Sequence, residues 1–349
     1  MTDSSVLATR SGHLARLTLN RPEALNALTT PMCELLTEAL LGLQGDTDVA
    51  CVLLDGAGER AFCAGGDVVM LHDSGKARDG RAEGFWRTEY ALNDLIHRYA
   101  KPYVSLIDGI VMGGGVGLSV HGRYRVAGDT TLFAMPETGI GYFPDVGGTF
   151  FLPRLGEGDS LAIGNWLGLT GARLGPAQCV ELGIATHFVP TENHAGLART
   201  LTKEDDAGAV LDMMHTDPPA GEPVPDAVRC FDHDSVAEII DALEADGSDW
   251  AQGQLKQLRR KSPLALAVTL EALRRGRQMS FRECMAMELD LSLNFLSTQD
   301  FYEGIRAQLI DKDRKPQWSH DGADAVTDQQ VERMFRATDG APLVFHAKG

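Results

Sequence analysis

The chain has 349 residues, of which 44% are hydrophobic, so it can form one large domain or a main domain with an appendage. Its 49 acidic residues outnumber 32 basic ones, which gives a net charge of -17 at pH 7. Because this charge repels polyanions, we expect no nucleic-acid partner. A local basic pocket for one phosphorylated ligand stays compatible with the composition.

Six cysteines are spread along the chain without a CxxC pair or a Cys/His cluster at metal-ligand spacing. We therefore expect reduced, buried thiols and no metal site. The cysteines are Cys33, Cys51, Cys63, Cys179, Cys230 and Cys284.

The first residues, Met1 to Ser5, lack a basic segment followed by an apolar stretch, and no later segment supplies roughly 18 uninterrupted apolar residues. The sequence therefore predicts a soluble, cytoplasmic protein that has no membrane partner.

The first predicted elements are a strand and a helix. Residues 14–19 form a strand-like run that stops before Pro22, where proline favours a turn. A helix follows, with Thr30 as its expected cap and Pro31 in its first position. Its apolar residues recur at helical spacing and predict one buried face. They are Met32, Leu35, Leu36, Ala39, Leu40 and Leu43.

Two continuous apolar runs, Val49–Leu54 and Tyr103–Ile107, are typical of strands that are covered on both sides. Each run is followed by a glycine-bearing loop, Cys63–Asp67 in the first case and Met112–Gly117 in the second. The order of strand, glycine loop and helix favours an α/β domain whose chemistry lies at the ends of strands.

The pattern changes after the first half of the chain. We expect a core domain over residues 1–190 and an irregular or short-helical connection over 191–253, where acidic and proline-bearing stretches dominate. A helix from Ser262 to Arg275 and a helical stripe from Phe281 to Leu293 then predict a helical carboxyl-terminal region over residues 254–349.

The glycine triplet Gly113–Gly115 allows the backbone to approach a ligand closely and to direct free N–H groups at it. Such donors stabilise the negative charge that forms on a thioester oxygen during attack. The alternative is a tight packing loop. A second glycine loop, at Gly65 and Gly66, strengthens the first interpretation, because two converging N–H groups make a complete oxyanion hole. No correctly placed GxGxxG or GxxxxGK[ST] motif points to a nucleotide instead.

Two carboxylates stand among apolar and glycine residues between Phe133 and Gly148, namely Glu137 and Asp145. An acid in such surroundings can have a raised pKa and exchange protons near neutral pH. Glu137 could equally be a helix cap or one half of an ion pair, and Asp145 a turn residue. Glu89 lies on a predicted helix around residues 86–96, and the residues alone favour a solvated position for it.

Four segments, CAGGD, MGGGVGLSVHG, FAMPETGIGYFPDVGG and EGIRAQLIDKDRKPQW, occur in this order. With them the chain resembles the crotonase (enoyl-CoA hydratase/isomerase) superfamily and, within it, the 3-hydroxyisobutyryl-CoA hydrolase family. The resemblance covers roughly residues 14–189 and 261–318. It implies a spiral of ββα turns with a mainly helical carboxyl-terminal region. It also implies an acyl-CoA substrate and no cofactor, since the CoA is part of the substrate. Relatives often form oligomers, so a homo-oligomer is an open expectation.

The resemblance also implies roles for individual residues. Gly66 and Gly114 match the positions whose backbone N–H groups form the family's oxyanion hole. Glu137 matches the glutamate that follows proline in the superfamily, and Asp145 matches the aspartate of the hydrolase segment FPDVGG. Glu89 matches a substrate-contacting glutamate of that branch.

One departure bears on the reaction. Enoyl-CoA hydratases carry a second catalytic glutamate at the position that Gly117 occupies here, so hydration should be severely weakened. We expect thioester hydrolysis, as in valine breakdown, with Glu137 as nucleophile or general base and Asp145 as proton donor or as a partner of the acyl hydroxyl. The alternatives are a hydratase or isomerase on the same scaffold and an acyl-CoA-binding module with little activity.

Near the carboxyl terminus, the resemblance suggests that basic residues contact CoA phosphates. The alternative is a solvated helix end. The residues concerned are Arg306, Lys312, Arg314 and Lys315.

Overall fold

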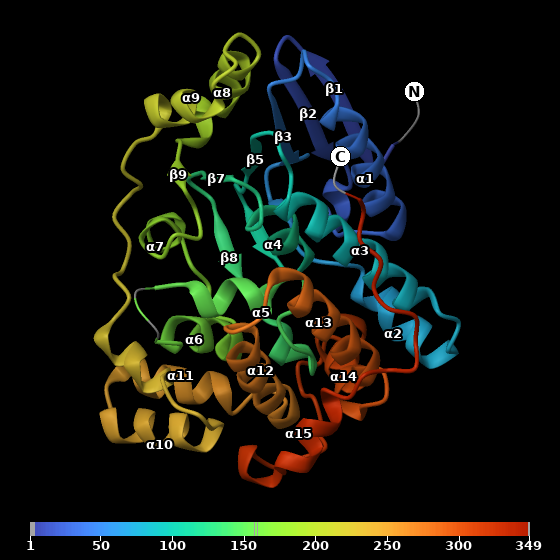
Figure 1. Cartoon of the computed structure of the whole chain (residues 1–349). Helices are drawn as coiled ribbons and strands as arrows, with labels where there is room; N and C mark the ends of the chain where they lie inside the picture. The colour runs from blue at the N-terminus through green and yellow to red at the C-terminus, as the bar shows by residue number, and fades with distance from the viewer. Residues whose placement is uncertain (1–3, 157, 159, 348–349) are drawn as a thin grey trace.

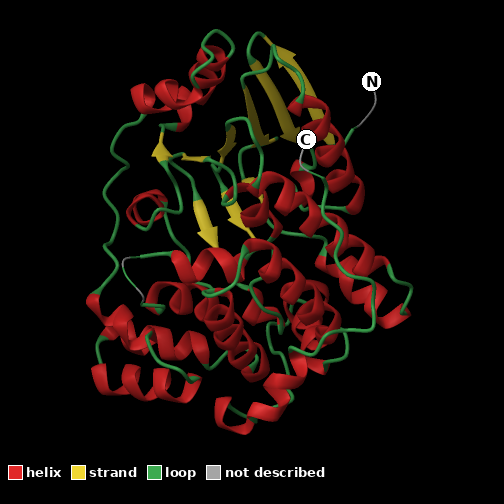
Figure 2. Cartoon of the chain, in the orientation of Figure 1, coloured by secondary structure: helices red, strands yellow, loops and turns green. Residues whose placement is uncertain are grey.

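The computed structural model describes residues 4–156, 158 and 160–347, and in this part the strands form two sheets (Figures 1 and 2). The larger sheet has six strands in the order β1-β2-β3-β5-β7-β9, and the smaller has three in the order β4-β6-β8. Only the β1–β2 pair is antiparallel within these sheets. The strands are β1 (Val6–Ser11), β2 (Leu14–Leu19), β3 (Cys51–Gly56), β4 (Ala61–Cys63), β5 (Tyr103–Leu106), β6 (Ile110–Met112), β7 (Tyr124–Ala127), β8 (Leu132–Ala134) and β9 (His187–Phe188).

Helices surround the two sheets and make up most of the second half of the chain (Figure 2). They are α1 (Thr30–Gln44), α2 (Val68–Ala77), α3 (Arg81–His97), α4 (Gly114–Ser119), α5 (Gly148–Phe151), α6 (Ala162–Thr170), α7 (Pro176–Glu181), α8 (His194–Leu201), α9 (Ala207–Met214), α10 (Val236–Asp246), α11 (Asp249–Leu258), α12 (Pro263–Gly276), α13 (Phe281–Phe295), α14 (Gln299–Ile305) and α15 (Asp328–Met334).

From β3 onward, successive strands alternate between the two sheets. In each of the pairs β3–β4, β5–β6 and β7–β8 the first strand joins the larger sheet and the second joins the smaller. Helices follow β4 and β6 before the next pair begins. This repetition is the ββα spiral that the resemblance implied, so the predicted fold class is confirmed.

The two faces of β3 explain its continuous apolar sequence. Val52 and Leu54 belong to the main hydrophobic cluster. Cys51 and Leu53 point to a second cluster, to which Leu197 of α8 and residues of α9 also belong. Since α8 and α9 cover one face of the larger sheet, every side chain of this strand is shielded from water.

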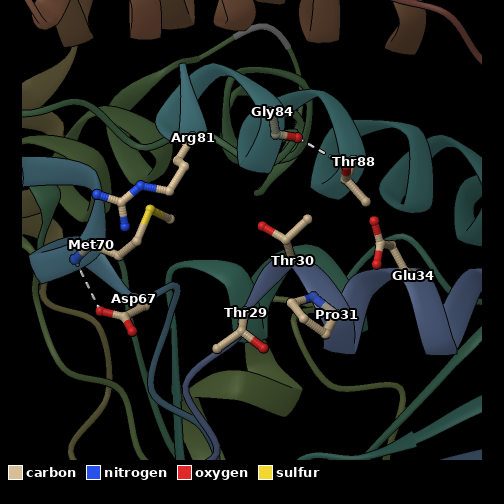
Figure 3. A pocket seen from close by; sticks show the side chains of 9 residues that line it. All are labelled: Thr29, Thr30, Pro31, Glu34, Asp67, Met70, Arg81, Gly84 and Thr88. Carbon is tan, nitrogen blue, oxygen red and sulfur yellow. Dashed lines mark hydrogen bonds between the residues drawn. The ribbon is translucent and has the colours of Figure 1, made fainter. Parts of the chain in front are cut away.

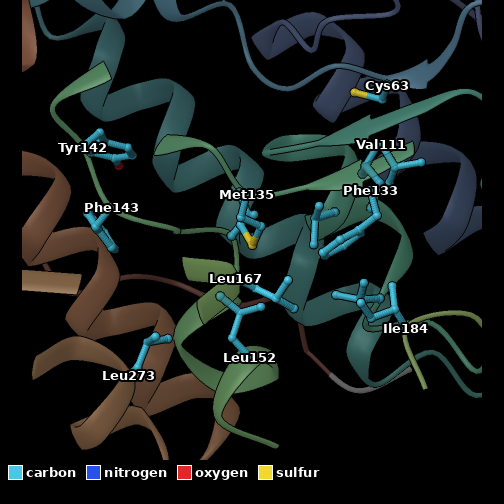
Figure 4. Packing of buried hydrophobic residues seen from close by; sticks show 14 of the residues in the cluster. Cys63, Val111, Phe133, Met135, Tyr142, Phe143, Leu152, Leu167, Ile184 and Leu273 are labelled. Carbon is cyan, nitrogen blue, oxygen red and sulfur yellow. The ribbon is translucent and has the colours of Figure 1, made fainter. Parts of the chain in front are cut away.

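The carboxyl-terminal helices pack against the same core as the sheets. Ser262 caps α12 by accepting a hydrogen bond from the N–H of Ala265. Its position directly before the predicted helix is the one at which a serine cap is expected. Figure 4 shows Leu273 of α12 among buried side chains that include Leu152 and Leu167. The predicted helix that begins after Ser262 is confirmed, and it ends at Gly276.

The main hydrophobic cluster extends from Val6 in β1 to Met334 in α15. Residues 191–253 contain α8 to α10 and the first half of α11, and residues 215–225 form neither helix nor strand. The division into segments at residues 190 and 253 stays a prediction.

Sequence reasoning missed one strand and placed one helix cap wrongly. The sequence gives no sign of β1, because this edge strand exposes every residue after Val6 and so has no alternating apolar pattern. Thr29, not Thr30, is the N-cap residue of α1. Pro31 does lie in the first turn, where the missing N–H costs no intrahelical hydrogen bond.

All six cysteines are buried and unpaired. Across the described residues, no helix combines the length and the apolar character that crossing a bilayer would require.

Replacing Leu273 by alanine should lower the free energy of unfolding by about 2–5 kcal/mol, because Leu273 is 0% exposed and the change leaves a cavity between α12 and the core. Chemical denaturation measures this. Met213, at 70% exposure, provides the control, and its replacement by alanine should change stability by no more than about 0.5 kcal/mol. Equal, small effects of both changes would show that α12 does not pack on the core as described.

Candidate active site

All five predicted site residues line one cavity of about 1290 Å³. They come from five different segments, so that only folding brings them together. Gly66 follows β4, and Gly114 begins α4. Glu89 lies in α3. Glu137 begins a 3₁₀ turn (Glu137–Ile140) after β8, and Asp145 lies in the loop before α5.

The two glycine loops converge at one end of this cavity. Leu28 fixes the first loop, since its N–H donates to the carbonyl of Gly65 and its own carbonyl accepts from the N–H of Asp67. A Cβ atom placed on Gly113 would lie 3.3 Å from the Cα of Gly65. The two backbones are therefore so close that a side chain at Gly113 would force them apart.

Each predicted oxyanion donor follows a glycine with positive φ. Gly65 has a φ of 120° and precedes Gly66, while Gly113 has a φ of 47° and precedes Gly114. Among the described residues, neither the N–H of Gly66 nor that of Gly114 donates a hydrogen bond to a protein group. Two donors on converging loops are thus free to bind one oxygen of a ligand.

Glu137 lies against the second loop. A Cβ atom on Gly113 would be 3.2 Å from its Oε1, and its Oε2 is buried without a hydrogen-bond partner in the described structure. Burial, followed by the charge of Asp145, raises the pKa of Glu137 to about 8. In the part of the chain that the structure describes, this carboxyl group caps no helix and forms no close ion pair, and it can change its protonation state near neutral pH.

Glu89 is buried, at 2% exposure, so the solvated position that the residues alone favoured is wrong. A Cβ atom on Gly114 would lie only 2.5 Å from its Oε1. Burial first, and then the charges of Asp145 and Glu288, hold its pKa well above the usual range. Glu89 therefore lies beside the predicted donor Gly114 as an acid that favours its neutral form.

Asp145 is held by two tyrosines. Its Oδ2 accepts hydrogen bonds from the hydroxyl groups of Tyr90 at 2.7 Å and Tyr142 at 3.2 Å, and both hydroxyls also lie within hydrogen-bond distance of Ser292. Burial raises the pKa of Asp145 to about 6, and the two tyrosine bonds oppose this rise because they stabilise the carboxylate. Asp145 thus ionises more easily than Glu137.

The turn that carries Asp145 is strained and is fixed from outside. Val146 has a φ of 53°, which is unfavourable for a β-branched residue. His121 bonds to the carbonyl of Val146 through Nε2 at 2.7 Å. Glu288 of α13 accepts from the N–H groups of Gly147 and Thr149. These contacts over-determine the turn and so fix the direction of Asp145.

At Gly117 there is no room for a side chain. A Cβ atom there would lie 2.7 Å from the Cβ of Val146 and 2.8 Å from Nδ2 of Asn93. The strained turn after Asp145 thus occupies the space that a longer residue at position 117 would need.

Sequence reasoning missed the residues that position the carboxylates, above all Tyr90, Ser292 and Glu288. Glu288 and Ser292 are polar residues four positions apart within the apolar stripe of α13, and both are 0% exposed. Polar residues on a predicted core face are the signal that could have identified them.

The predicted basic residues lie only partly at the cavity. Arg314 lines it, whereas Lys312 and Lys315 are exposed outside its lining. The guanidinium group of Arg306 pairs with three carboxylates, those of Glu303, Asp311 and Asp313. Arg306 is therefore unavailable to a phosphate unless these pairs break.

Other basic residues that the sequence did not single out line the same cavity. Arg259 pairs with Glu244 at 2.7 Å. Arg173, Arg260 and Arg314, here called the cavity arginines, form no ion pair in the described part of the chain. They can bind an anionic group at this cavity.

A second cavity of about 500 Å³ lies between α1, α2 and α3 (Figure 3). Asp67 lines it, but the side chain of this residue already caps α2 by accepting from the N–H of Met70. None of the predicted site residues lines this cavity. The chemistry of the site is therefore confined to the larger cavity.

Comparison with known proteins agrees with this arrangement. A family model described as "Enoyl-CoA hydratase/isomerase" matches residues 14–335. The chain belongs to this family. The 3-hydroxyisobutyryl-CoA hydrolase of Xenopus tropicalis is 43% identical over 98% of this chain and 91% of its own, and that of Homo sapiens is 41% identical over 97% and 90%.

Solved structures from the same family carry different names. A carnitinyl-CoA dehydratase from Mycobacterium thermoresistibile has a TM-score of 0.91 at 41% identity and covers 99% of both chains. An enoyl-CoA hydratase from Rhodobacter sphaeroides has a TM-score of 0.87 at 42% identity and covers 98% of this chain and 100% of its own. The family is thus shown, and the site must distinguish between the reactions that its members are named for.

Replacing Glu137 by glutamine should stabilise the protein in a pH-dependent manner. The pKa of Glu137 is raised from 4.5 to about 8 in the folded state, so the stability that its neutral form contributes is complete below about pH 4.5 and is lost as the pH rises through about 8. Glutamine stays neutral at every pH and does not lose this stability. Near pH 8 the free energy of unfolding of Glu137→Gln should therefore exceed that of wild type by on the order of 2–4 kcal/mol.

Denaturation of both proteins at pH values from about 5 to 8 measures this advantage. The exposed Glu38 provides the control, since its replacement by glutamine should give no comparable trend. An advantage of Glu137→Gln that stays constant over this range would show that Glu137 is not buried in a poorly solvated site.

Proposed function

We propose that this protein hydrolyses a short, branched acyl-CoA thioester and that its substrate is 3-hydroxyisobutyryl-CoA, the thioester for which its relatives are named. The observation that carries this proposal is the site around Gly117, where Val146 and Asn93 leave no room for a second catalytic glutamate. The acids near the free N–H groups are instead Glu89, Glu137 and Asp145.

In the proposed reaction, the thioester oxygen accepts hydrogen bonds from the N–H groups of Gly66 and Gly114. These donors stabilise the negative charge that develops on this oxygen, and the loss of one such donor typically costs roughly 3–4 kcal/mol in the transition state. Glu137 comes from a third segment, but its Oε1 lies against Gly113, directly before Gly114, so the bound carbonyl carbon is held next to the Glu137 carboxylate.

Glu137 then acts in one of two ways. As a nucleophile, its carboxylate oxygen bonds to the carbonyl carbon, the C–S bond breaks, the thiolate takes a proton, and water cleaves the resulting anhydride. As a general base, it removes a proton from the water that attacks the carbon. Both routes consume one water and yield the carboxylic acid and CoA, so the reaction needs no cofactor besides the CoA of the substrate.

We propose that Asp145 and Glu89 contact the acyl group of the substrate. Asp145 either gives a proton to the departing thiolate or accepts a hydrogen bond from the acyl hydroxyl group, and the two tyrosine bonds fix its orientation for either role. Glu89 contacts the substrate beside Gly114.

The cellular setting is part of the proposal. Hydrolysis of this thioester would belong to valine breakdown. The expectation of a cytoplasmic protein stays a prediction, since the vertebrate relatives are named as mitochondrial proteins. A homo-oligomer also stays a prediction.

The reaction is tested by following thiol release from 3-hydroxyisobutyryl-CoA. The wild-type protein should release CoA, and Glu137→Gln should slow release by at least about a hundredfold, because glutamine is neither a base nor a nucleophile. The exposed Glu38→Gln serves as the matched control and should retain the wild-type rate.

Each other outcome supports a different function. Equal rates for wild type and Glu137→Gln would remove Glu137 from the mechanism. Loss of the absorbance of a conjugated enoyl thioester without thiol release would indicate a hydratase, the name that the solved relative from Rhodobacter sphaeroides carries. Tight binding of short acyl-CoA thioesters without turnover would indicate a binding module.

The CoA phosphates are proposed to contact the cavity arginines. Arg314→Met should raise the KM for the CoA thioester by about tenfold, the effect of losing one charged hydrogen bond, and should leave kcat nearly unchanged. The KM for a truncated N-acetylcysteamine thioester, which has no phosphates, should not change. The exposed Lys312→Met is the control. An equal rise in KM for both substrates would contradict phosphate recognition.

A further inference from the structure

Lys261 is the one lysine that lines the active-site cavity in the described structure, and it has no role in the reaction as written above. It directly precedes α12, and its side chain is partly buried. No protein group among the described residues accepts a hydrogen bond from its Nζ or pairs with it as a close ion pair. A cation in such a place loses hydration without a direct partner, and this arrangement calls for an explanation.

The backbone holds Lys261 close to the turn that carries Glu137. The N–H of Ser262 donates to the carbonyl of Thr138 at 3.2 Å, so residues adjacent to Lys261 and Glu137 are joined directly. The hydroxyl group of Ser262 also donates to Asp300 at 2.5 Å. These two bonds fix the start of α12 against the Glu137 turn and limit how far the lysine can move away.

Gly139 provides space for the lysine side chain. A Cβ atom at this position would lie 3.2 Å from Nζ and 3.8 Å from Cδ of Lys261. The φ of Gly139 is not in the positive range that favours glycine. The Lys261 ammonium group therefore lies directly against the backbone of Gly139, two residues after Glu137.

The charged and titratable groups around Glu137 are unevenly distributed. Glu89 from α3, Asp145 from the strained turn, and Tyr142 line the same cavity, and none of them can supply a positive charge. Lys261, next to the cap residue of α12, faces the Glu137 turn, and Arg173 lies close enough to Lys261 to repel it. Arg260 and Arg314 complete the basic lining.

We propose that Lys261 is a positioning residue for catalysis, because its ammonium group beside the Glu137 turn keeps the Glu137 carboxylate ionised in a buried site. This inference rests on the proposed function, in which ionised Glu137 is the base or nucleophile. The direction of the effect follows from Coulomb attraction, since an opposite charge within a few ångströms favours the ionised form of an acid.

The effect has a defined pH range. The charge of Lys261 lowers the pKa of Glu137, against the larger rise caused by burial. Burial in turn lowers the pKa of Lys261 to about 8, so above about pH 8 the lysine loses its charge and with it its influence. Lys261 should therefore support activity at neutral and mildly acidic pH and become dispensable in alkaline solution.

The test is a pH profile of kcat/KM for thiol release in wild type, Lys261→Met and Lys261→Arg. Without the charge, Glu137 ionises only at higher pH. At pH 6.5, kcat/KM of Lys261→Met should thus be about tenfold lower than that of wild type, and near pH 9 it should approach the wild-type value. The tenfold estimate corresponds to a rise of about one pH unit in the midpoint of the Glu137 ionisation. Lys261→Arg keeps the charge and should restore the wild-type midpoint. Lys256→Met, which removes an exposed charge from α11, is the matched control and should leave the profile unchanged.

A direct titration of Glu137 separates this inference from the proposed function. The infrared band of its carboxyl group, isolated as the difference between each protein and its Glu137→Gln counterpart, should titrate at higher pH in Lys261→Met than in wild type. If wild type releases no thiol, the proposed function fails, and the titration still decides whether Lys261 holds Glu137 ionised.

Several outcomes would overturn the inference. One is that the carboxyl group of Glu137 titrates at the same pH in Lys261→Met as in wild type. In that case the variant would release thiol more slowly by the same factor at every pH, or would change KM alone. If Lys261→Met does not fold, Lys261→Gln replaces it, since glutamine keeps a polar side chain and removes the charge. An unchanged midpoint in that variant would equally contradict the proposal.

Discussion

The site depends on the close approach of two backbone loops, which only glycine permits. A Cβ atom on Gly113 would lie 3.3 Å from the Cα of Gly65, and one on Gly115 would lie 2.2 Å from the carbonyl oxygen of Cys63. Because the loops leave β4 and β6, which pair in the smaller sheet, the ββα spiral places them side by side. The free N–H groups of Gly66 and Gly114, the position of Glu89 and that of Glu137 all follow from this contact.

Burial of three acids near these N–H groups is electrostatically unfavourable, and two of them, Asp145 and Glu137, differ in how far the fold compensates for it. Asp145 receives two tyrosine hydrogen bonds and has a pKa of about 6, whereas Glu137, which no side chain among the described residues hydrogen-bonds, has a pKa of about 8. Acids whose pKa values are separated in this way can take different roles in one reaction. The charge of Lys261 is the means by which the proposed mechanism keeps Glu137 usable near neutral pH.

Much of the fold could be predicted from the sequence because its signals are local. The apolar run of β3 and the Ser262 cap of α12 each show in a few adjacent residues. The three-residue strands of the smaller sheet and the exposed edge strand β1 have no such pattern. For the site, the glycine loops and two acids were visible, but the burial of Glu89 depends on helices far along the chain. The proximity of Lys261 to Glu137 likewise joins segments that are distant in sequence.

The central claim is that two backbone N–H groups hold the thioester oxygen next to Glu137. The most direct measurement is the carbonyl stretching frequency of a substrate labelled with ¹³C at the thioester carbon, bound to the inactive Glu137→Gln protein. Two hydrogen bonds from a water-excluded site polarise the carbonyl more than water does, so the band should move to lower frequency than in solution. A band at or above its frequency in water would show that the carbonyl is not bound between Gly66 and Gly114, and the proposed mechanism would be wrong.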